Sequence, residues 1–291
     1  MAEAAQPGFG ERLHRVFRAH GHLCVGIDPH AYLLERWGLP DDAEGAARMG
    51  AAVVEAAAGR AGIVKPQIAF FERHGSAGYA ALERVLALAR AAGLIVIGDV
   101  KRGDVGSSVD AYAQAWLTPG HPLECDAITL SPFQGFGSLH GPLSLAQRTG
   151  KGVFVLAATS NPESAAVQGA LVRSEPRRGM SVAAGILADV DEWNREHADG
   201  PIGSAGVVIG ATIDAALLGL PEPADAPVAP VLAPGFGHQG AGVADIPAVY
   251  GRRAEAVIVN ESRGILSRGP GGLESAIAER AEDLAQVLDR G

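Results

Sequence analysis

Short β-branched segments recur along the chain at a regular interval, and this spacing constrains the fold more than any other feature. Each segment ends in Gly, Asp, Ser, Thr or Pro, and Ala- and Leu-rich stretches with helical periodicity separate the segments. Eight can be counted: LCVGID from 23, IVKPQIAF from 63, LIVIGDVK from 94, AITLSP from 127, GVFVLAAT from 152, AGVVIGAT from 205, PVLAPGFG from about 228 and AVIVNES from 256. The starts at 23 and 256 are 233 residues apart over seven intervals, so a strand begins about every 33 residues, the size of one βα unit.

Alternating strands and helices predict a parallel sheet, and eight parallel units that close on themselves form a (β/α)8 TIM barrel of typically about 250 residues. Residues 1–291 then form a single domain, with an N-terminal extension or helix at 1–22. The clearest helical stretches are 46–60, 80–93, 181–197 and 272–290. The fifth and sixth strand starts are 53 residues apart, and within this interval residues 160–180 form either a lid loop or a mobile surface insertion.

Composition narrows the classes of partner. The net charge of −9 argues against a broad basic surface for nucleic acid, so any anion must be captured locally. Two cysteines, Cys24 and Cys125, are too few for a disulfide framework and fit a reducing compartment. No apolar run approaches the roughly 18–20 residues needed to span a bilayer, and the first residues lack a secretory apolar region. We therefore expect a cytoplasmic protein that binds neither nucleic acid nor membrane.

The densest group of charged residues lies in GDVKRGDVGSS, residues 98–108. Barrel enzymes carry catalytic groups at the carboxyl ends of their strands, where this segment falls. Asp99 and Lys101 are two apart in a strand and share a face, and the glycines that follow allow Asp104 and Ser108 to turn back to the rim. A lysine flanked by two carboxylates stays protonated, so Lys101 is expected to be a positioned acid rather than a nucleophile.

A solvated salt-bridge cluster would show the same D-x-K-x-x-D pattern, so a second observation is needed. Lys65 lies at the end of the neighbouring predicted strand. Two lysines and two aspartates have no net charge, which is the balance needed to hold several ionised groups in a partly desolvated pocket. Lys65 therefore favours a functional site over a surface cluster.

A phosphate site is predicted by two segments near the end of the chain. APGFGHQG at 233–240, with Gly235 and Gln239, lets backbone N–H groups converge on an anion, and Arg263 in VNESRGI at 259–265 adds a bidentate clamp. The loops after strands seven and eight are the usual phosphate site of barrels. The first segment also matches G-x-G-x-x-G, but a dinucleotide-binding fold needs several further strands after that loop and only one remains.

Histidine does not point to a metal site. The nine histidines include no H-E-x-x-H pattern and no cysteine partner at zinc spacing, so no bound metal is expected. His30 follows Asp28 and could face the site, although we expect a surface role.

At this point the segments together resemble a known family. They are GIDPH at 26–30, VKPQIAFFE at 64–72, GDVKRGDVGSS, TLSPFQGFGSL at 129–139, ATSNP at 158–162, VVIGAT at 207–212, APGFGHQG and NESRGI. In this order they resemble orotidine 5'-phosphate decarboxylase in its longer bacterial (type 2) form, common in actinobacteria. The resemblance implies conversion of orotidine 5'-monophosphate to UMP and CO₂ in de novo pyrimidine synthesis, without a metal or organic cofactor.

The resemblance also implies roles for the charged residues. Lys101 matches the lysine that protonates the ring carbon losing its carboxylate, and Asp99 matches the aspartate beside that carboxylate. Lys65 matches the lysine that bridges this aspartate and the ribose. Asp104, the fourth catalytic residue, and Ser108 match residues that family dimers contribute across the subunit interface. A homodimer with a shared active site is therefore implied.

The other expected substrate-binding residues also lie at or near strand ends. The full set is Asp28, Ser108, Ser131, Asn161, Gly235, Gln239 and Arg263. Asp28 matches a ribose-hydroxyl ligand and Ser131 a contact to the pyrimidine amide. Gln239 and Arg263 match phosphate ligands, while Ser262 stands where shorter family members often have glycine.

Two other functions fit parts of the pattern. A Mg²⁺-dependent sugar-phosphate decarboxylase or aldolase of the related barrel group shares D-x-K-x-x-D but tends to carry an acidic residue in place of Lys65. A non-catalytic barrel that binds a phosphorylated ligand would not need the group of two lysines and two aspartates described above.

Overall fold

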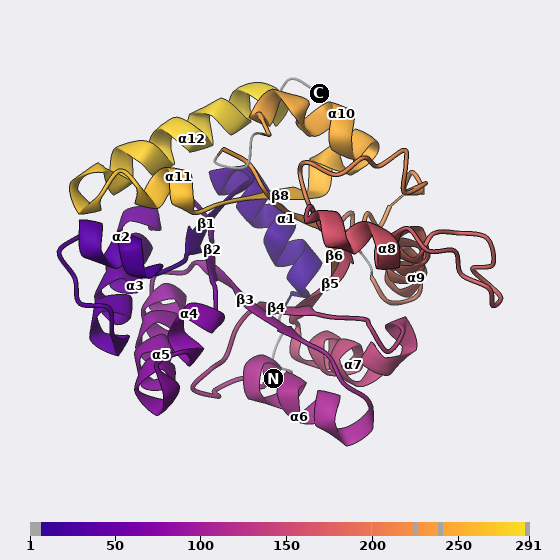
Figure 1. Cartoon of the computed structure of the whole chain (residues 1–291), viewed down its shortest axis with the longest axis horizontal. Coiled ribbons are helices and arrows are strands. Elements are labelled where there is room, and N and C mark those ends of the chain that lie inside the picture. The colour runs from indigo at the N-terminus through magenta and orange to yellow at the C-terminus, as the bar shows by residue number, and fades with distance from the viewer. Residues whose placement is uncertain (1–6, 199, 224–225, 238–240, 289–291) are drawn as a thin grey trace, which may run out of the picture.

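Eight parallel strands close into a barrel in chain order, β1 to β8, with β8 pairing β1 (Figure 1). The computed structural model describes residues 7–198, 200–223, 226–237 and 241–288. The strands are β1 Leu23–Ile27, β2 Ile63–Pro66, β3 Ile95–Arg102, β4 Ala127–Leu130, β5 Gly152–Ala158, β6 Ala205–Ile209, β7 Val231–Pro234 and β8 Val257–Glu261. Each falls within one of the eight predicted segments or reaches one residue past it, so the predicted (β/α)8 barrel is confirmed.

Helices surround the barrel (Figure 1). They are α1 Phe9–His20, α2 Ala31–Arg36, α3 Ala43–Ala57, α4 Ala69–Glu72, α5 Gly75–Ala91, α6 Gly106–Leu117, α7 His140–Thr149, α8 Ala165–Gln168, α9 Val182–His197, α10 Ile246–Tyr250, α11 Arg263–Leu266 and α12 Leu273–Leu288. Helices α3, α5, α9 and α12 match the four predicted stretches. The sequence analysis missed α6 and α7, whose first turns contain Gly, Ser or Pro and hide the apolar stripe that follows.

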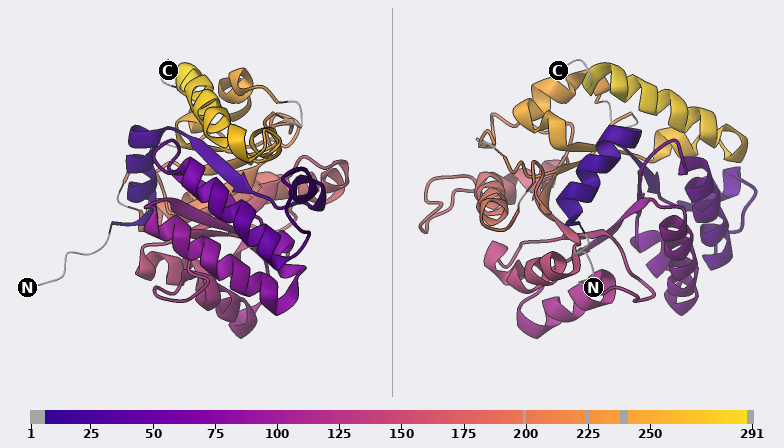
Figure 2. Two further views of the ribbon diagram at one scale, coloured as in Figure 1. Left: turned by 90° about the vertical axis from the view of Figure 1, so that its left-hand side faces the viewer. Right: turned by 180° about the vertical axis from the view of Figure 1, so that it is seen from behind.

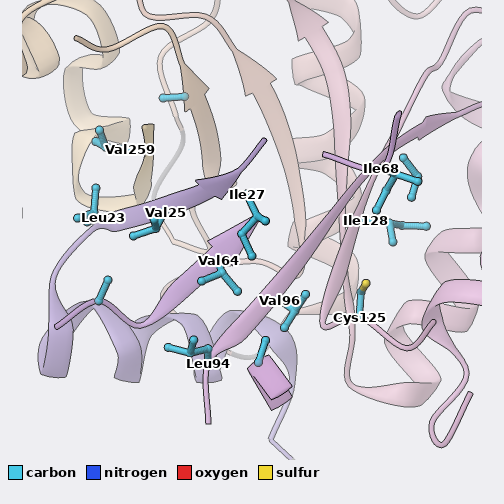
Figure 3. Close-up of a cluster of buried hydrophobic side chains, with 14 of the residues drawn as sticks. Leu23, Val25, Ile27, Val64, Ile68, Leu94, Val96, Cys125, Ile128 and Val259 are labelled. Atoms are coloured by element: carbon cyan, nitrogen blue, oxygen red, sulfur yellow. The ribbon is translucent and has the colours of Figure 1, made fainter. Parts of the chain in front are cut away.

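Alternate strand residues separate two layers of the core. Leu23, Val25 and Val64 belong to the layer between barrel and helices (Figure 3). Cys24, between Leu23 and Val25, and Ile63, just before Val64, point to the other face and belong to a second cluster. This alternation is the period-two pattern of a strand buried on both faces, and it explains why the strands read as continuous apolar runs.

Helix α1 lies across the amino-terminal end of the barrel (Figure 2). Phe9, Leu13 and Phe17 recur every four residues, so they share one helix face, and they join the second cluster. The ring of Phe9 meets Phe154 of β5 edge to face at 5.9 Å. A side chain on Gly152 would lie 2.5 Å from the Phe9 ring, so glycine is needed there. The amino-terminal end is thereby filled with apolar side chains.

The interval between β5 and β6 contains α8 and an excursion closed by an antiparallel bridge between Leu171 and Ser181. Arg177 of this excursion pairs with Asp189 at 2.8 Å and with Glu192, both on α9. Residues 171–181 are thus tied to α9. None of the helices in the described part of the chain is long and apolar enough to cross a membrane.

Candidate active site

A buried aspartate with a lysine on each carboxylate oxygen lies at the carboxyl ends of β2 and β3. Lys65 Nζ is 2.8 Å from Asp99 Oδ2, and Lys101 Nζ is 2.6 Å from Asp99 Oδ1. Lys65 and Asp99 are 4% and 8% exposed, whereas the Lys101 side chain is 45% exposed. The structure therefore brings together three of the four charged residues expected there.

The three groups shift one another's protonation. Burial would raise the pKa of Asp99, but the two ammonium groups hold that pKa well below its ordinary value. Burial opposes the charged form of Lys65, yet the carboxylates of Asp99 and Asp28 raise the pKa of Lys65 above its ordinary value. Partial burial lowers the pKa of Lys101, against the opposing effect of Asp99. Lys101 is thus the lysine that gives up a proton more readily.

Two uncharged residues complete this cluster, and the sequence analysis missed both. Thr129 of β4 donates its hydroxyl to Asp99 Oδ1 at 2.8 Å. The Gln67 amide nitrogen donates to Asp99 Oδ2, and the Gln67 amide oxygen accepts from Lys101 Nζ at 3.2 Å. Gln67 lies two residues after Lys65 and bridges to Asp99, so its position in the β2 segment was an available signal.

Asp104 and Ser108 are not part of this cluster within one chain. No ion pair among the described residues joins Asp104 to either lysine, and Asp104 Oδ1 accepts the backbone N–H of Val105 at 2.8 Å. Ser108 is exposed in the first turn of α6. Among the described residues of one chain, both lysines therefore pair with Asp99 and neither pairs with Asp104.

A cavity of about 360 Å³ lies beside the cluster at the carboxyl end of the barrel. Its lining comes from the ends of five strands and the segments after them: Asp28, His30, Lys65, Gln67, Phe70, Asp99, Pro234, Gly235, Phe236, Asn260, Ser262 and Arg263. The cavity extends from Lys65 and Asp99 to the two segments predicted to bind phosphate, at Gly235 and Arg263. A larger cleft of about 870 Å³ lies beside α1, α7 and α9 at the other end of the barrel, and it contains none of the predicted site residues.

Asp28 and Arg263 meet the cavity from β1 and β8. Ser262, just before Arg263, donates its hydroxyl to Asp28 Oδ2 at 2.6 Å. Asp28 Oδ1 is buried without a hydrogen-bond partner among the described residues, which leaves an acceptor for a ligand hydroxyl. A Cβ on Gly26 would lie 2.5 Å from Ser262 Cβ, so the glycine of GIDPH allows this close approach.

His30 also lines this cavity, which is the alternative that the sequence left open, and it is half-buried there. Its ring packs on Phe70 of α4 with centroids 4.1 Å apart. Burial lowers the pKa of His30, with Asp28 opposing and Arg263 adding to the shift. His30 therefore favours the neutral form beside the arginine.

The glycine-rich loop after β7 and the start of α11 pack against one carboxylate. Glu261, 4% exposed, pairs with Arg280 of α12, with Nε and Oε2 2.6 Å apart. A Cβ on Gly264 would lie 2.0 Å from Glu261 Oε1, and one on Gly237 would lie 2.9 Å from it. Gly235 is buried with φ of 111°, a conformation that requires glycine. Gln239 lies outside the described residues.

Ser131 and Asn161 do not line the cavity. The backbone N–H of Ser131 donates to Arg102 O at 2.7 Å, which places Ser131 just beyond β4. Asn161 accepts from the Thr159 hydroxyl at 2.8 Å and donates to Glu163 at 3.0 Å in an exposed turn after β5. Both residues are at the correct end of the barrel but outside the pocket of this conformation.

Comparison with known proteins identifies the family. The model of the family described as orotidine 5'-phosphate decarboxylase / HUMPS matches residues 21–274. An orotidine 5'-phosphate decarboxylase of Salinispora tropica is 50% identical over 268 residues, which cover 90% of this chain and 91% of the relative.

Two solved structures are similar along the whole chain. One, a Streptomyces avermitilis protein provisionally named an orotidine 5'-phosphate decarboxylase, has a TM-score of 0.91 and 44% identity over 99% of both chains. The other is the OMP decarboxylase of Leishmania donovani, with a TM-score of 0.74 and 29% identity over 97% of this chain and 99% of that one. This chain therefore belongs to the orotidine 5'-phosphate decarboxylase / HUMPS family.

Proposed function

We propose that this protein decarboxylates orotidine 5'-monophosphate to UMP and CO₂, the last step of de novo pyrimidine synthesis, in the cytoplasm. The observation that carries the proposal is the buried Asp99 with Lys65 and Lys101 on its two oxygens, beside a cavity that ends at Arg263. Membership of the family and half-identical relatives with this name support it.

The chemistry follows from where charge develops. When the bond to the carboxylate breaks, its electron pair stays on the ring carbon, in the plane of the ring and without an ordinary electron sink. A preorganised ammonium group stabilises such an anion more effectively than water does. Lys101 supplies this ammonium and then transfers a proton to the carbon, leaving a neutral amine that solvent reprotonates. Its lowered pKa favours the transfer.

Asp99 and Lys65 hold Lys101 and the ribose end of the substrate in place. Asp99 binds both ammonium groups, so Lys101 is fixed before the substrate arrives. The free Oδ1 of Asp28 suits a ribose hydroxyl. Arg263 and the loop at Gly235 suit the phosphate, and binding energy there can drive closure of residues 160–180. In that closed state Asn161 would reach the substrate, and Ser131, outside the closing segment, is the proposed contact to the pyrimidine amide.

The active enzyme is proposed to be a homodimer in which Asp104 and Ser108 reach the site of the other subunit. Within the described part of its own chain, Asp104 forms no ion pair with a lysine. Val105 and Tyr112, on the same segment, are 56% and 40% exposed, and Phe133 in the loop after β4 is 82% exposed. These side chains supply an apolar surface around Asp104 that a second subunit can cover.

Mixing two inactive variants tests the shared site. Lys101→Ala and Asp104→Asn each remove one half of the charged group. In a mixed dimer one site lacks both groups, while the other combines the intact Lys101 of one chain with the intact Asp104 of its partner. Refolding the variants together should restore about a quarter of wild-type turnover. No recovery would show that each chain builds its own site.

The activity itself is tested by the absorbance change when orotidine 5'-monophosphate is converted to UMP. Wild-type protein should turn over with EDTA present, whereas Lys101→Ala should bind UMP without turnover and Arg263→Ala should mainly raise KM. Loss of turnover in EDTA would favour the Mg²⁺-dependent sugar-phosphate enzymes. Binding of the nucleotide without any turnover by wild-type protein would favour a non-catalytic barrel.

A further inference from the structure

The backbone of Lys101 has an unusual conformation. Its φ is +46°, and among the described residues it is the one non-glycine residue with a positive φ. A lysine side chain rarely adopts this left-handed region, because its Cβ crowds the backbone. The conformation must therefore be held by contacts around it.

The pairing of β3 with β4 is interrupted at this residue. Gly98 pairs with Ile128 and Arg102 pairs with Leu130, so three residues of β3 face a single residue of β4. That residue is Thr129. The bulge places both Asp99 and Lys101 opposite one side chain, and it leaves the backbone N–H of Lys101 outside the regular pairing.

Thr129 binds both of these residues through one oxygen. Its Oγ1 accepts the backbone N–H of Lys101 at 2.9 Å and donates to Asp99 Oδ1 at 2.8 Å. The same Oδ1 receives Lys101 Nζ at 2.6 Å. Because a backbone N–H only donates and an ionised carboxylate only accepts, the hydroxyl proton has one available direction. Thr129 is 1% exposed, so water does not compete for these bonds.

We propose that Thr129 is a positioning residue for decarboxylation: its hydroxyl fixes the left-handed backbone of Lys101 and the orientation of Asp99, and thereby sets where the Lys101 ammonium lies. The inference rests on the function proposed above. A hydroxyl at this position is required because no aliphatic side chain both donates and accepts. Serine keeps this ability, whereas valine has the shape of threonine without it.

Kinetics of two variants test this role. Thr129→Val should lower kcat about 10- to 100-fold, since a displacement of about 1 Å can cost about 100-fold in rate. Its KM and its Kd for UMP should stay within about threefold of wild type, because Thr129 does not line the cavity. Thr129→Ser should recover most of kcat. Thr149→Val is the matched control: it removes a part-buried hydroxyl that bonds Leu145 O in α7, so kcat should not change.

Each outcome separates the inference from the function on which it rests. If wild-type protein shows no turnover, the proposed function is overturned, and Thr129 then has no role in a decarboxylation rate. With an active wild type, an unchanged kcat in Thr129→Val overturns the positioning role alone. An equal loss of kcat in Thr129→Ser, or weakened UMP binding in Thr129→Val, also overturns it, because the effect would then come from packing or from the substrate pocket.

Discussion

The two lysines on Asp99 should have different effects on stability although both are needed for turnover. Lys65 is 4% exposed and its pKa is raised, so its ammonium group is bound more favourably in the folded chain than in the unfolded chain. Breaking a buried ion pair costs about 3–5 kcal/mol. We expect about 3 kcal/mol for Lys65→Met, the lower end, because Lys101 and Thr129 still bind one oxygen of Asp99.

Lys101 presents the opposite case. Its side chain is 45% exposed and its pKa is lowered, so folding does not favour its charge. Substitutions at such positions usually change stability by less than about 0.5 kcal/mol. Lys101→Met should therefore unfold near the wild-type midpoint, or slightly above it, while losing turnover.

Thermal and urea unfolding of the two variants measures this difference. A chain of this size loses about 2 °C of Tm per kcal/mol, so Lys65→Met should melt about 6 °C below wild type.

The ion pair also makes stability depend on pH. The Asp99 carboxylate stabilises the fold above its ordinary pKa of 3.8, and this stability is lost as the pH falls toward its depressed folded pKa. Lys65 contributes below its ordinary pKa of 10.5, which is lost as the pH rises toward its raised folded value.

The stability gap between wild type and Lys65→Met should therefore be widest between about pH 4 and pH 10. It should narrow on acidification below that window. Equal midpoints for Lys65→Met and wild type at pH 7, or a gap that grows in acid, would refute the reasoning. An equally large loss of stability in Lys101→Met would do so too.

Three further predictions follow from the geometry. Lys101→Gly should be more stable than Lys101→Ala by about 1 kcal/mol in urea unfolding, because glycine adopts a φ of +46° without strain; equal midpoints would contradict the strain. Phe9→Ala should cost about 3–5 kcal/mol by emptying the amino-terminal end of the barrel, with UMP affinity unchanged by calorimetry; a smaller loss would mean that α1 is not part of the core. Gly264→Ala should raise KM for the nucleotide because its Cβ would lie 2.0 Å from Glu261, whereas Gly271→Ala, with open space around it, should leave KM unchanged. Equal KM values for the two variants would show that the segment around Gly264 does not bind the phosphate.

The sequence was sufficient for the barrel because strand pattern and repeat length are local properties. Each apolar segment is buried on both faces, so it reads as a continuous run whatever its partners are. Helices α6 and α7 were missed because their polar first turns break the apolar period on which the prediction relies.

The candidate site was predicted only in part. Lys65, Asp99 and Lys101 could be named because the carboxyl ends of parallel strands meet at one end of a barrel. Asp104 could not be placed, because the path of the turn after β3 depends on contacts that the spacing of residues does not specify. The sequence left two positions open for His30 for the same reason, since its place depends on how α2 and α4 pack.

By itself, the sequence determined the closed eight-stranded barrel and the end at which its charged residues gather, because both follow from periodicity along the chain. Only the tertiary structure decided that Lys101 has a left-handed backbone, that Thr129 binds it and Asp99 together, and that Asp104 accepts the backbone N–H of Val105. These features depend on the register of β3 against β4, where one bulge changes which side chains face one another. Register arises from pairing between distant segments, and a single sequence carries no direct record of it.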